Sequence, residues 1–301
     1  MSVDTPVQLV RPTEPKPPWL KVRAPGSKNY LYLKNLMKEL NLHTVCEEAR
    51  CPNIGECWHH GTATFMILGD VCTRACAYCA VSHGRPNELD RAEPSRVAHA
   101  IETMALRHAV ITSVDRDDLA DGGASIFAET IRQTRIRIPS CRIEVLIPDF
   151  QGIEASLFEV LNAGPDVLNH NIETVPRLYR TARSGSRYPR SLELLDRARR
   201  HRPSTPTKTG MMVGLGETVD EMVSVFGDLR EVGVSILTIG QYLRPTAAHA
   251  PMTRYYHPSE FAELKTLALG KGFAHVESGP LVRSSYHAHE QADAVLTARN
   301  K

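Results

Sequence analysis

The sequence has no long hydrophobic run, few aromatic residues and almost no excess charge of either sign. No window reaches the roughly 20 apolar residues that a transmembrane helix needs. The net charge is +2 and the pI about 8.2, too near neutral to favour nucleic acid or an anionic membrane surface. Residues 177–202 contain nine arginines but only two tyrosines and neither Phe nor Trp, which is typical of a solvated helix face. We therefore expect no nucleic-acid partner and no membrane partner.

The first twenty residues, MSVDTPVQLVRPTEPKPPWL, lack the basic stretch and apolar run of a secretory signal. Asp4 and Glu14 also count against an organelle transit peptide. Residues 1–26 carry six prolines, which predicts an extended arm in place of a helix. We expect a cytoplasmic location, where clustered cysteines bind metal or do chemistry more often than they form disulfides.

From residue 63 onward, short apolar segments alternate with helix-like segments. The apolar, β-branched runs are at 62–69, 108–114, 142–148, 166–172, 207–215 and 235–243. Strands that alternate with amphipathic helices are typical of a parallel sheet with right-handed crossovers. Six such units are fewer than the eight of a complete barrel, so a partial barrel and an open doubly wound sheet both fit the periodicity.

Polar residues recur where the predicted strands end, and they favour the barrel. They are Cys72, Ser113, Asp115, Asp149 and residues 170–173. In parallel α/β folds, sites are built at this edge of the sheet. The predicted fold class is therefore α/β, a partial (β/α)6 TIM-like barrel with N-terminal and C-terminal extensions.

The expected boundaries divide the chain into three parts. Residues 1–61 form the N-terminal extension, and residues 62–272 form the barrel. Residues 273–301 read as a strand, a loop and a helix. We expect this last part to lie outside the strand–helix repeat.

Three cysteines in eight residues, CTRACAYC (72–79), are the strongest functional signal. A structural zinc site normally has four ligands, and His83 is the only further candidate nearby. A [4Fe–4S] cluster held by three thiolates leaves one iron open to a small chelating molecule. We therefore expect an iron–sulfur cluster at Cys72, Cys76 and Cys79, with zinc as the alternative.

A second triplet, CEEARCPNIGEC, contains Cys46, Cys51 and Cys57, with spacings of five and six positions. Two triplets predict two metal sites with three thiolates each. Cys141 stands alone at the start of an apolar strand, and we expect it to be an inert core thiol.

CTRACAYC has an aromatic residue before its last cysteine and follows the first strand of the repeat. In both respects it resembles the cysteine motif of the radical S-adenosylmethionine (SAM) superfamily. Combined with the second triplet and RSSYHA (283–288), it resembles the lipoyl synthase family. The likeness continues through DDLADGG (117–123), HNIETVPRLY (170–179), GLGET (214–218) and QYLRP (241–245).

The resemblance implies that Cys72, Cys76 and Cys79 hold a reducing [4Fe–4S] cluster whose open iron chelates SAM. Electron transfer into the sulfonium would release methionine and a 5′-deoxyadenosyl radical, which abstracts hydrogen from an unactivated carbon. The cofactor would supply this chemistry, and the protein would supply position and a dry cavity.

The resemblance also implies that Cys46, Cys51 and Cys57 hold an auxiliary [4Fe–4S] cluster, with Ser285 as its fourth ligand. A hydroxyl oxygen matches cluster iron less well than a thiolate. Such a weak ligand suits a cluster that is dismantled to donate its sulfur. The alternative for Ser285 is an N-cap of the C-terminal helix.

Five further residues are candidate cofactor contacts by the same resemblance. Gly122 and Gly123 would run beside the methionine part of SAM, although alone they read as a turn. Asn171 and Glu173 would meet ribose hydroxyls or the amino group, with a solvated strand end as the alternative. Lys208 would pair either with the cofactor carboxylate or with a structural acid.

The implied reaction inserts two sulfur atoms, at C6 and C8, into an octanoyl chain on a lysine of a carrier protein, as the final step of lipoate cofactor formation. Implied partners are octanoylated carrier domains, namely the acyltransferase components of 2-oxo acid dehydrogenases and the glycine cleavage H protein. An electron donor such as ferredoxin or flavodoxin is also implied. Two other readings stay open, a radical SAM sulfurtransferase with a small free acid as substrate and a zinc-stabilised scaffold.

Overall fold

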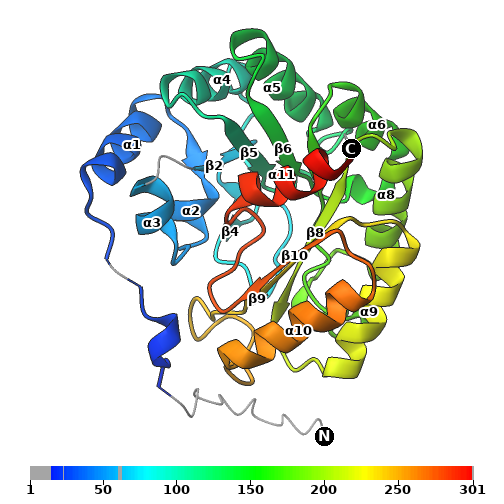
Figure 1. Cartoon of the computed structure of the whole chain (residues 1–301). Coiled ribbons are helices and arrows are strands. Elements are labelled where there is room, and N and C mark those ends of the chain that lie inside the picture. The colour runs from blue at the N-terminus through cyan, green and yellow to red at the C-terminus, as the bar shows by residue number, and fades with distance from the viewer. Residues whose placement is uncertain (1–14, 23, 60–62, 300–301) are drawn as a thin grey trace, which may run out of the picture.

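The main sheet has eight strands, arranged in the order in which they occur along the chain (Figure 1). The computed structural model describes residues 15–22, 24–59 and 63–299. The strands are β1 (His43–Thr44), β2 (Thr64–Ile67), β5 (His108–Ser113), β6 (Arg142–Leu146), β7 (Val167–Asn169), β8 (Thr207–Val213), β9 (Ile236–Gln241) and β10 (His275–Gly279). Only β1 runs antiparallel to its neighbour. A doubly wound sheet reverses its strand order, so this unbroken order confirms the barrel alternative.

Six helices lie around the outside of the strands, and each follows one strand of the barrel (Figure 1). They are α4 (Glu93–Thr103), α5 (Ala124–Arg137), α6 (Glu154–Asn162), α8 (Tyr188–His201), α9 (Val219–Glu231) and α10 (Pro258–Gly270). Local sequence defines their ends. For example, α9 begins with a capping box in which Thr218 and Glu221 bond each other's backbone N–H groups.

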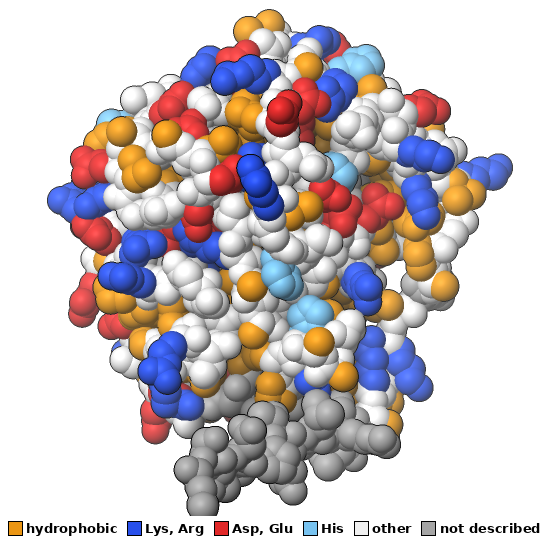
Figure 2. Space-filling model, turned by 180° about the vertical axis from the view of Figure 1, so that it is seen from behind, with side chains coloured by type: hydrophobic (Ala, Val, Ile, Leu, Met, Phe, Trp, Pro, Cys, Tyr) orange, Lys and Arg blue, Asp and Glu red, His pale blue; other side chains and the backbone are white. Residues whose placement is uncertain are grey.

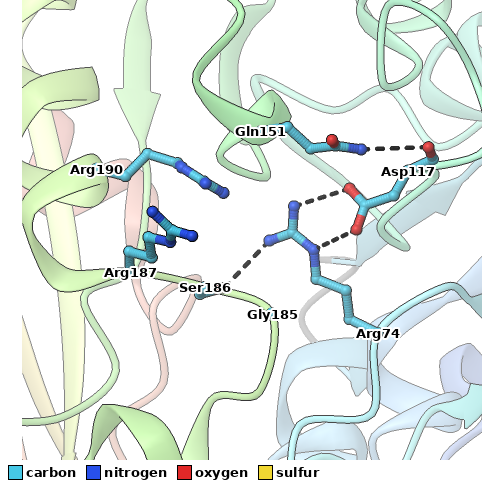
Figure 3. A pocket seen from close by; sticks show the side chains of 7 residues that line it. All are labelled: Arg74, Asp117, Gln151, Gly185, Ser186, Arg187 and Arg190. Atoms are coloured by element: carbon cyan, nitrogen blue, oxygen red, sulfur yellow. Dashed lines mark hydrogen bonds and ion pairs between the residues drawn. The ribbon is translucent and has the colours of Figure 1, made fainter.

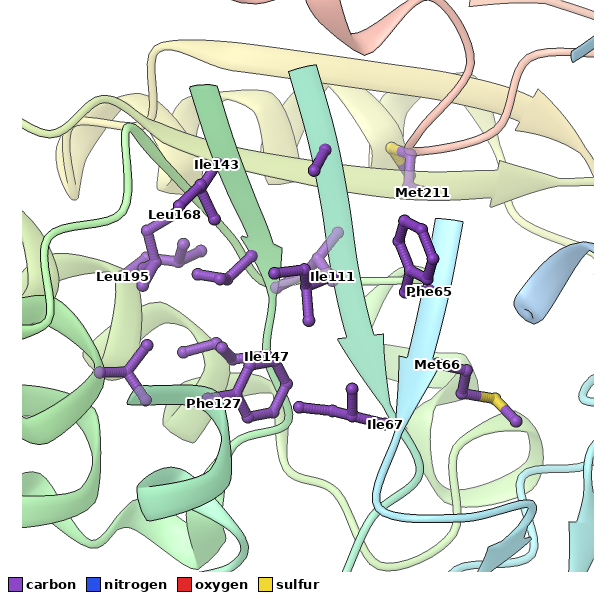
Figure 4. Packing of buried hydrophobic residues seen from close by; sticks show 14 of the residues in the cluster. Phe65, Met66, Ile67, Ile111, Phe127, Ile143, Ile147, Leu168, Leu195 and Met211 are labelled. Atoms are coloured by element: carbon purple, nitrogen blue, oxygen red, sulfur yellow. The ribbon is translucent and has the colours of Figure 1, made fainter. Parts of the chain in front are cut away.

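The core fills the space between the strands and these helices. Phe65, Ile111 and Ile143 of the strands are fully buried, and they lie with Phe127 of α5 and Leu195 of α8 in one apolar cluster (Figure 4). Full burial of such a side chain contributes about 1.5–3 kcal/mol.

Cys141 belongs to the same core cluster and is fully buried. Burial raises the pKa of its thiol to about 11. The predicted place of Cys141 in the core is therefore confirmed, and its inertness stays a prediction.

We expected the strand of the C-terminal extension to lie outside the strand–helix repeat. The structure places it inside the repeat. β10 pairs in parallel with β9 over five residues, from His275 opposite Ile236 to Gly279 opposite Gly240. It follows α10, so the strand–helix repeat continues for one more strand. Without β10, the edge of β9 would present unpaired backbone N–H and C=O groups.

The two extensions meet at the open side of the barrel, between β1 and β10. The N-terminal one contributes α1 (Lys28–Glu39), α2 (Val45–Glu48) and α3 (Ile54–His59), and the C-terminal one contributes α11 (Ala288–Arg299). Asn53 donates a hydrogen bond to the carbonyl oxygen of Leu281 at 2.7 Å. Tyr286 donates one to Glu56 at 3.2 Å. The second cysteine triplet and the RSSY segment therefore lie side by side.

The N-terminal arm is described only from residue 15, so residues 1–14 of the predicted extended segment lie outside the described residues, as does the expected boundary at 61/62. Within the described part, Pro18–Leu20 forms one 3₁₀ turn. Leu20 is buried, and Trp19 contacts the ring of His257 edge-on at 4.9 Å. This part of the arm is thus fixed to the barrel surface.

Acidic and basic side chains are interspersed over the face seen in Figure 2, in agreement with the net charge of +2. No helix within the described ranges has the length and apolar character to cross a membrane.

Candidate functional site

The first cysteine triplet lies in a loop directly after β2. Cys72 ends the short strand β3 (Val71–Cys72), which pairs with β4 (Ser82–His83), and the amide of Cys79 bonds the carbonyl of Cys76 at 3.0 Å. All three thiols are free and partly buried. Burial raises the pKa of Cys72 to about 11 and that of Cys76 to about 12, and neighbouring negative groups, including Cys79, add to both shifts. A bound cation would be needed to hold these thiols as thiolates.

The end of β5 anchors this loop. The sulfur of Cys72 accepts hydrogen bonds from the amides of Arg74 and Asp115 at 3.4 and 3.3 Å. Thr73 donates through both its amide and its hydroxyl to the carbonyl of Asp115, each at 3.0 Å. The position of Cys72 is therefore set by the loop that follows the neighbouring strand.

Arg74 ties the same loop to two further strand ends. Its side chain is only 4% exposed, and it donates to both carboxylate oxygens of Asp117 and to one of Asp149. It also donates to the hydroxyl of Ser186 at 3.1 Å. Charge-assisted pairs of this kind are among the stronger polar contacts in proteins.

The second triplet is built on two short helices. Cys46 is in α2, Cys57 is in α3, and Cys51 lies between them, with its amide bonded to the carbonyl of Cys46 at 3.0 Å. Burial raises the pKa of Cys46 to about 12, and the charges of Cys51 and Cys57 raise it further. The three thiols are therefore close enough to interact, and Trp58, which is fully buried, packs behind them.

Ser285 belongs to the loop between β10 and α11, and its neighbours Arg283 and Tyr286 both lie near this triplet. Its neighbour Arg283 is close enough to Cys51 to lower the pKa of that thiol against the raising effect of burial. The helix α11 starts at Ala288, so the N-cap position falls on His287 and not on Ser285. Within the described residues, the Ser285 hydroxyl makes no hydrogen bond, which leaves its oxygen free to bind a metal.

The two triplets supply the ligand type that iron–sulfur clusters take. Among the described residues, no three His, Cys, Asp or Glu side chains converge closely enough to hold one metal ion. A cubane cluster binds each thiolate through a different iron, so its ligands lie farther apart than the ligands of one ion. Two groups of three thiols outside any disulfide match the ligand preference of such clusters.

Gly122 and Gly123 lie where predicted, in the turn between β5 and α5. Their φ angles are 61° and 88°, and a Cβ at Gly123 would come within 2.3 Å of Leu68. Asp121 accepts a hydrogen bond from the amide of Gly123 at 2.9 Å. The turn itself requires these glycines, whether or not a cofactor lies against them.

Asn171 and Glu173 follow β7 and are partly buried, which differs from a solvated strand end. Burial raises the pKa of Glu173, and the charge of Arg183 together with hydrogen bonds from Asn171 and Tyr78 opposes the shift. Arg283 also acts on this carboxylate. Glu173 is thus near both Tyr78 of the first triplet's loop and Arg283 of the RSSY segment.

Lys208 pairs with an acid of the protein, which is one of the two partners expected for it. Its ammonium pairs with Glu144 at 2.8 Å, and the two side chains are 0% and 1% exposed. Asn169 donates to the same carboxylate oxygen at 3.2 Å. A buried carboxylate requires a partner of opposite charge, so the structural-acid alternative for Lys208 is the one observed.

Sequence reasoning missed Arg183, which was grouped with a solvated helix face. The residue is 8% exposed, and its guanidinium donates to the carbonyl of Asn171 at 2.7 Å and to the hydroxyl of Tyr179 at 3.2 Å. It also lowers the pKa of Cys76 against the effect of burial. A run of arginines carries no local signal that separates this buried member from exposed ones.

Comparisons with known proteins agree with this arrangement. Residues 66–229 match the model of the radical SAM superfamily, and residues 8–51 match the N-terminal domain of lipoyl synthase of that family. Among solved structures, methylornithine synthase has a TM-score of 0.54 at 13% identity, covering 81% of each chain. HydG, a maturase of the [FeFe]-hydrogenase, has a TM-score of 0.53 at 15% identity, covering 74% of this chain and 57% of its own. Both show likeness of fold alone.

Sequence relatives are much closer. The lipoyl synthase of Koribacter versatilis is 61% identical over 284 residues, which cover 94% of this chain and 93% of the relative. That of Rubrobacter xylanophilus is 62% identical over 278 residues, covering 92% and 87%. At this identity over nearly the full length, the chain belongs to the lipoyl synthase family of the radical SAM superfamily.

Proposed function

We propose that this site inserts two sulfur atoms, at C6 and C8, into an octanoyl chain carried on a lysine of a carrier protein, so that lipoyl-lysine is formed. The observation that carries the proposal is the position of the RSSY segment against the second triplet, through Asn53 and Leu281. One chain thus brings together three thiols after β2 and a second set of three thiols with a free hydroxyl. Sulfur insertion needs both a radical source and a sulfur source.

The cofactors of this reaction are two [4Fe–4S] clusters and SAM. Cys72, Cys76 and Cys79 would hold one cluster, and Cys46, Cys51, Cys57 and Ser285 would hold the other. When bound, these groups supply a 5′-deoxyadenosyl radical and the sulfur atoms. Burial otherwise keeps these thiols protonated, and either cluster would bind them as thiolates and balance their negative charge.

The chain's own groups would bind and position the reactants. Asn171 and Glu173 are proposed to bind SAM, because Glu173 lies near Tyr78 of the first triplet's loop and Asn171 lies near Glu173. Gly122 and Gly123 are proposed to pass close to its methionine part, since neither has a side chain in the way. Arg74 would keep Cys72 in place through its contacts with acids after β5 and β6.

The substrate is a lipoyl-carrier protein. Acyltransferase components of 2-oxo acid dehydrogenases and the glycine cleavage H protein are the carriers we propose, with ferredoxin or flavodoxin as electron donor and the cytoplasm as the location. We also propose the division into 1–61, 62–272 and 273–301, with β10 as the element of the last part that completes the sheet.

The test is anaerobic turnover with SAM, a reductant and an octanoylated carrier domain. The expected product is lipoyl-lysine, from protein that binds about eight irons in two clusters. Product from free octanoic acid, with none from the carrier domain, would favour the sulfurtransferase for small acids. A colourless protein that holds zinc and cleaves no SAM would favour the scaffold.

A further inference from the structure

A pocket of about 500 Å³ lies between the CTRACAYC loop and the segment that joins α7 (Tyr179–Ala182) to α8 (Figure 3). Its wall contains three guanidinium groups, from Arg74, Arg187 and Arg190, and one carboxylate, from Asp117. The guanidinium groups of Arg187 and Arg190 face Arg74 across the pocket (Figure 3). Three cations therefore border one hollow at the surface.

Two of the three cations already have acidic partners. Arg74 binds Asp117 through two hydrogen bonds, of 2.7 and 2.8 Å, and binds Asp149 at 2.6 Å. It also lies 3.3 Å from Asp115. Arg190 donates to the second oxygen of Asp149 at 3.2 Å. The acids in and behind the wall are thus bound by Arg74 and Arg190.

Of the three arginines, Arg187 is the one without an acidic partner among the described residues. It is exposed, and no carboxylate of the described residues lies within ion-pair distance of it. Its neighbour Gly185 has a φ of 85°, and a Cβ there would come within 3.3 Å of the Arg74 side chain, so this segment follows Arg74 closely. An anion in the pocket would give Arg187 the charged partner that the described residues do not supply.

The pocket lies on the same rim of the barrel as the first triplet. Its wall is formed after β2 by Arg74, after β5 by Asp117, after β6 by Gln151 and after β7 by Arg187. A carrier protein that brings its modified lysine to this rim would cover the pocket with its own surface. The anionic groups of an unmodified protein surface are the carboxylates of Asp and Glu, and a guanidinium binds them through two parallel hydrogen bonds.

We propose that this pocket receives an acidic side chain of the carrier protein, with Arg187 as its main partner and Arg190 as the second. The proposal rests on the proposed function, because it takes the substrate to be a protein. The pocket would fix the orientation in which the carrier presents its octanoyl-lysine. Electrostatic contacts at the rim of an interface act mainly on association and on its salt dependence.

The test compares Arg187→Glu, Arg187→Gln and Arg187→Lys with wild type. Binding of an octanoylated carrier domain is measured without turnover, at several salt concentrations, and KM is measured in parallel with the carrier domain and with a short octanoyl-lysine peptide that has no acidic residue. We expect Arg187→Glu to weaken carrier binding about tenfold, which corresponds to about 1.4 kcal/mol. Arg187→Gln should weaken carrier binding less, and Arg187→Lys least of all. For the peptide, the KM of each variant should equal that of wild type.

The matched control is Arg200→Glu, the same charge change on an exposed residue at the other end of α8. Equal weakening by Arg187→Glu and Arg200→Glu would show a general charge effect and overturn the proposal. Equal loss with carrier and peptide would overturn it as well, because the pocket would then act on the reaction centre. A wild-type protein that makes no lipoyl product would instead count against the proposed function.

Discussion

Asn53 and Leu281 are joined by a 2.7 Å hydrogen bond, although 228 residues separate them in the chain. This bond and the contact between Tyr286 and Glu56 hold the RSSY segment against the second cysteine triplet. The gap between β1 and β10 is closed by these two segments and not by further strands. The candidate auxiliary site therefore exists only when both ends of the chain are folded onto the barrel.

The first prediction concerns the division of labour between the triplets. A variant with Cys72→Ala, Cys76→Ala and Cys79→Ala should keep about four of about eight irons, because the second triplet is built on different elements. It should form no 5′-deoxyadenosine from SAM. Iron content, acid-labile sulfide and 5′-deoxyadenosine are the quantities to measure. Continued production of 5′-deoxyadenosine would show that the roles have been assigned to the wrong triplet.

The second prediction concerns Ser285. Ser285→Ala should leave SAM cleavage largely intact while it impairs sulfur insertion, since a free hydroxyl beside the second triplet is lost. Ser285→Cys should also uncouple SAM cleavage from sulfur insertion, because a thiolate binds cluster iron more tightly than a hydroxyl and resists displacement. The measurement is 5′-deoxyadenosine formed per lipoyl product, with Ser284→Ala as the control. A ratio equal to that of wild type in both Ser285 variants would remove this residue from the ligand set.

The third prediction concerns pH and His170. This imidazole is fully buried, where it bonds the carbonyl of Ile147 and the hydroxyl of Ser191. Burial, aided by the charge of Arg183, lowers its pKa from 6.5 to about 4. Between pH 6.5 and about pH 4, His170 is therefore protonated in the unfolded chain and neutral in the folded chain.

Because the folded pKa of His170 is the lower one, its effect on stability is absent above pH 6.5 and grows as the pH falls toward 4. From pH 7 to pH 4, the free energy of unfolding should fall by about 3 kcal/mol from this group. Urea unfolding at several pH values measures the slope, and His170→Gln should flatten it. An unchanged slope in that variant would mean that other groups cause the dependence.

The fourth prediction concerns the glycine turn before α5. Gly123 and Gly69 both have a φ of 88°, but a Cβ at Gly123 would meet Leu68 at 2.3 Å whereas one at Gly69 would have nothing within 4 Å. Both changes to Ala carry the cost of a left-handed backbone, about 1–3 kcal/mol. Gly123→Ala should cost about 1–3 kcal/mol more, from overpacking. Equal losses of stability in thermal unfolding would show that Leu68 moves aside without cost.

Much of the site could be predicted because its motifs are local. The spacing in CTRACAYC places three thiols in one loop, and the structure keeps them there, after β2. The alternation of strands and helices also predicted six parallel strands of the main sheet, β2, β5, β6, β7, β8 and β9, but not the short parallel pair of β3 and β4. It did not distinguish a barrel from a doubly wound sheet, because that choice depends on which strands are neighbours.

Local sequence could not decide the surroundings of side chains whose partners are distant in sequence. Lys208 was expected to pair with the cofactor carboxylate or with a structural acid, and its partner is Glu144, 64 residues away. Arg183 looked like part of a solvated face, but it is buried against Asn171 and Tyr179. Whether a charged side chain is exposed depends on what covers it, and that is not encoded in the residues beside it.

The sequence by itself determined the two cysteine triplets, the glycine turn and the positions of six strands along the chain, because each depends on residue type and short spacing. Only the tertiary structure decided that β10 completes the sheet, that the segment with Ser285 lies beside the second triplet, and that Arg187 has no acidic partner among the described residues. The physical reason is the same in each case. An unpaired strand edge, a charged side chain and a ligand group each interact with whichever groups the fold brings near. Folding can bring those groups from any distance along the sequence.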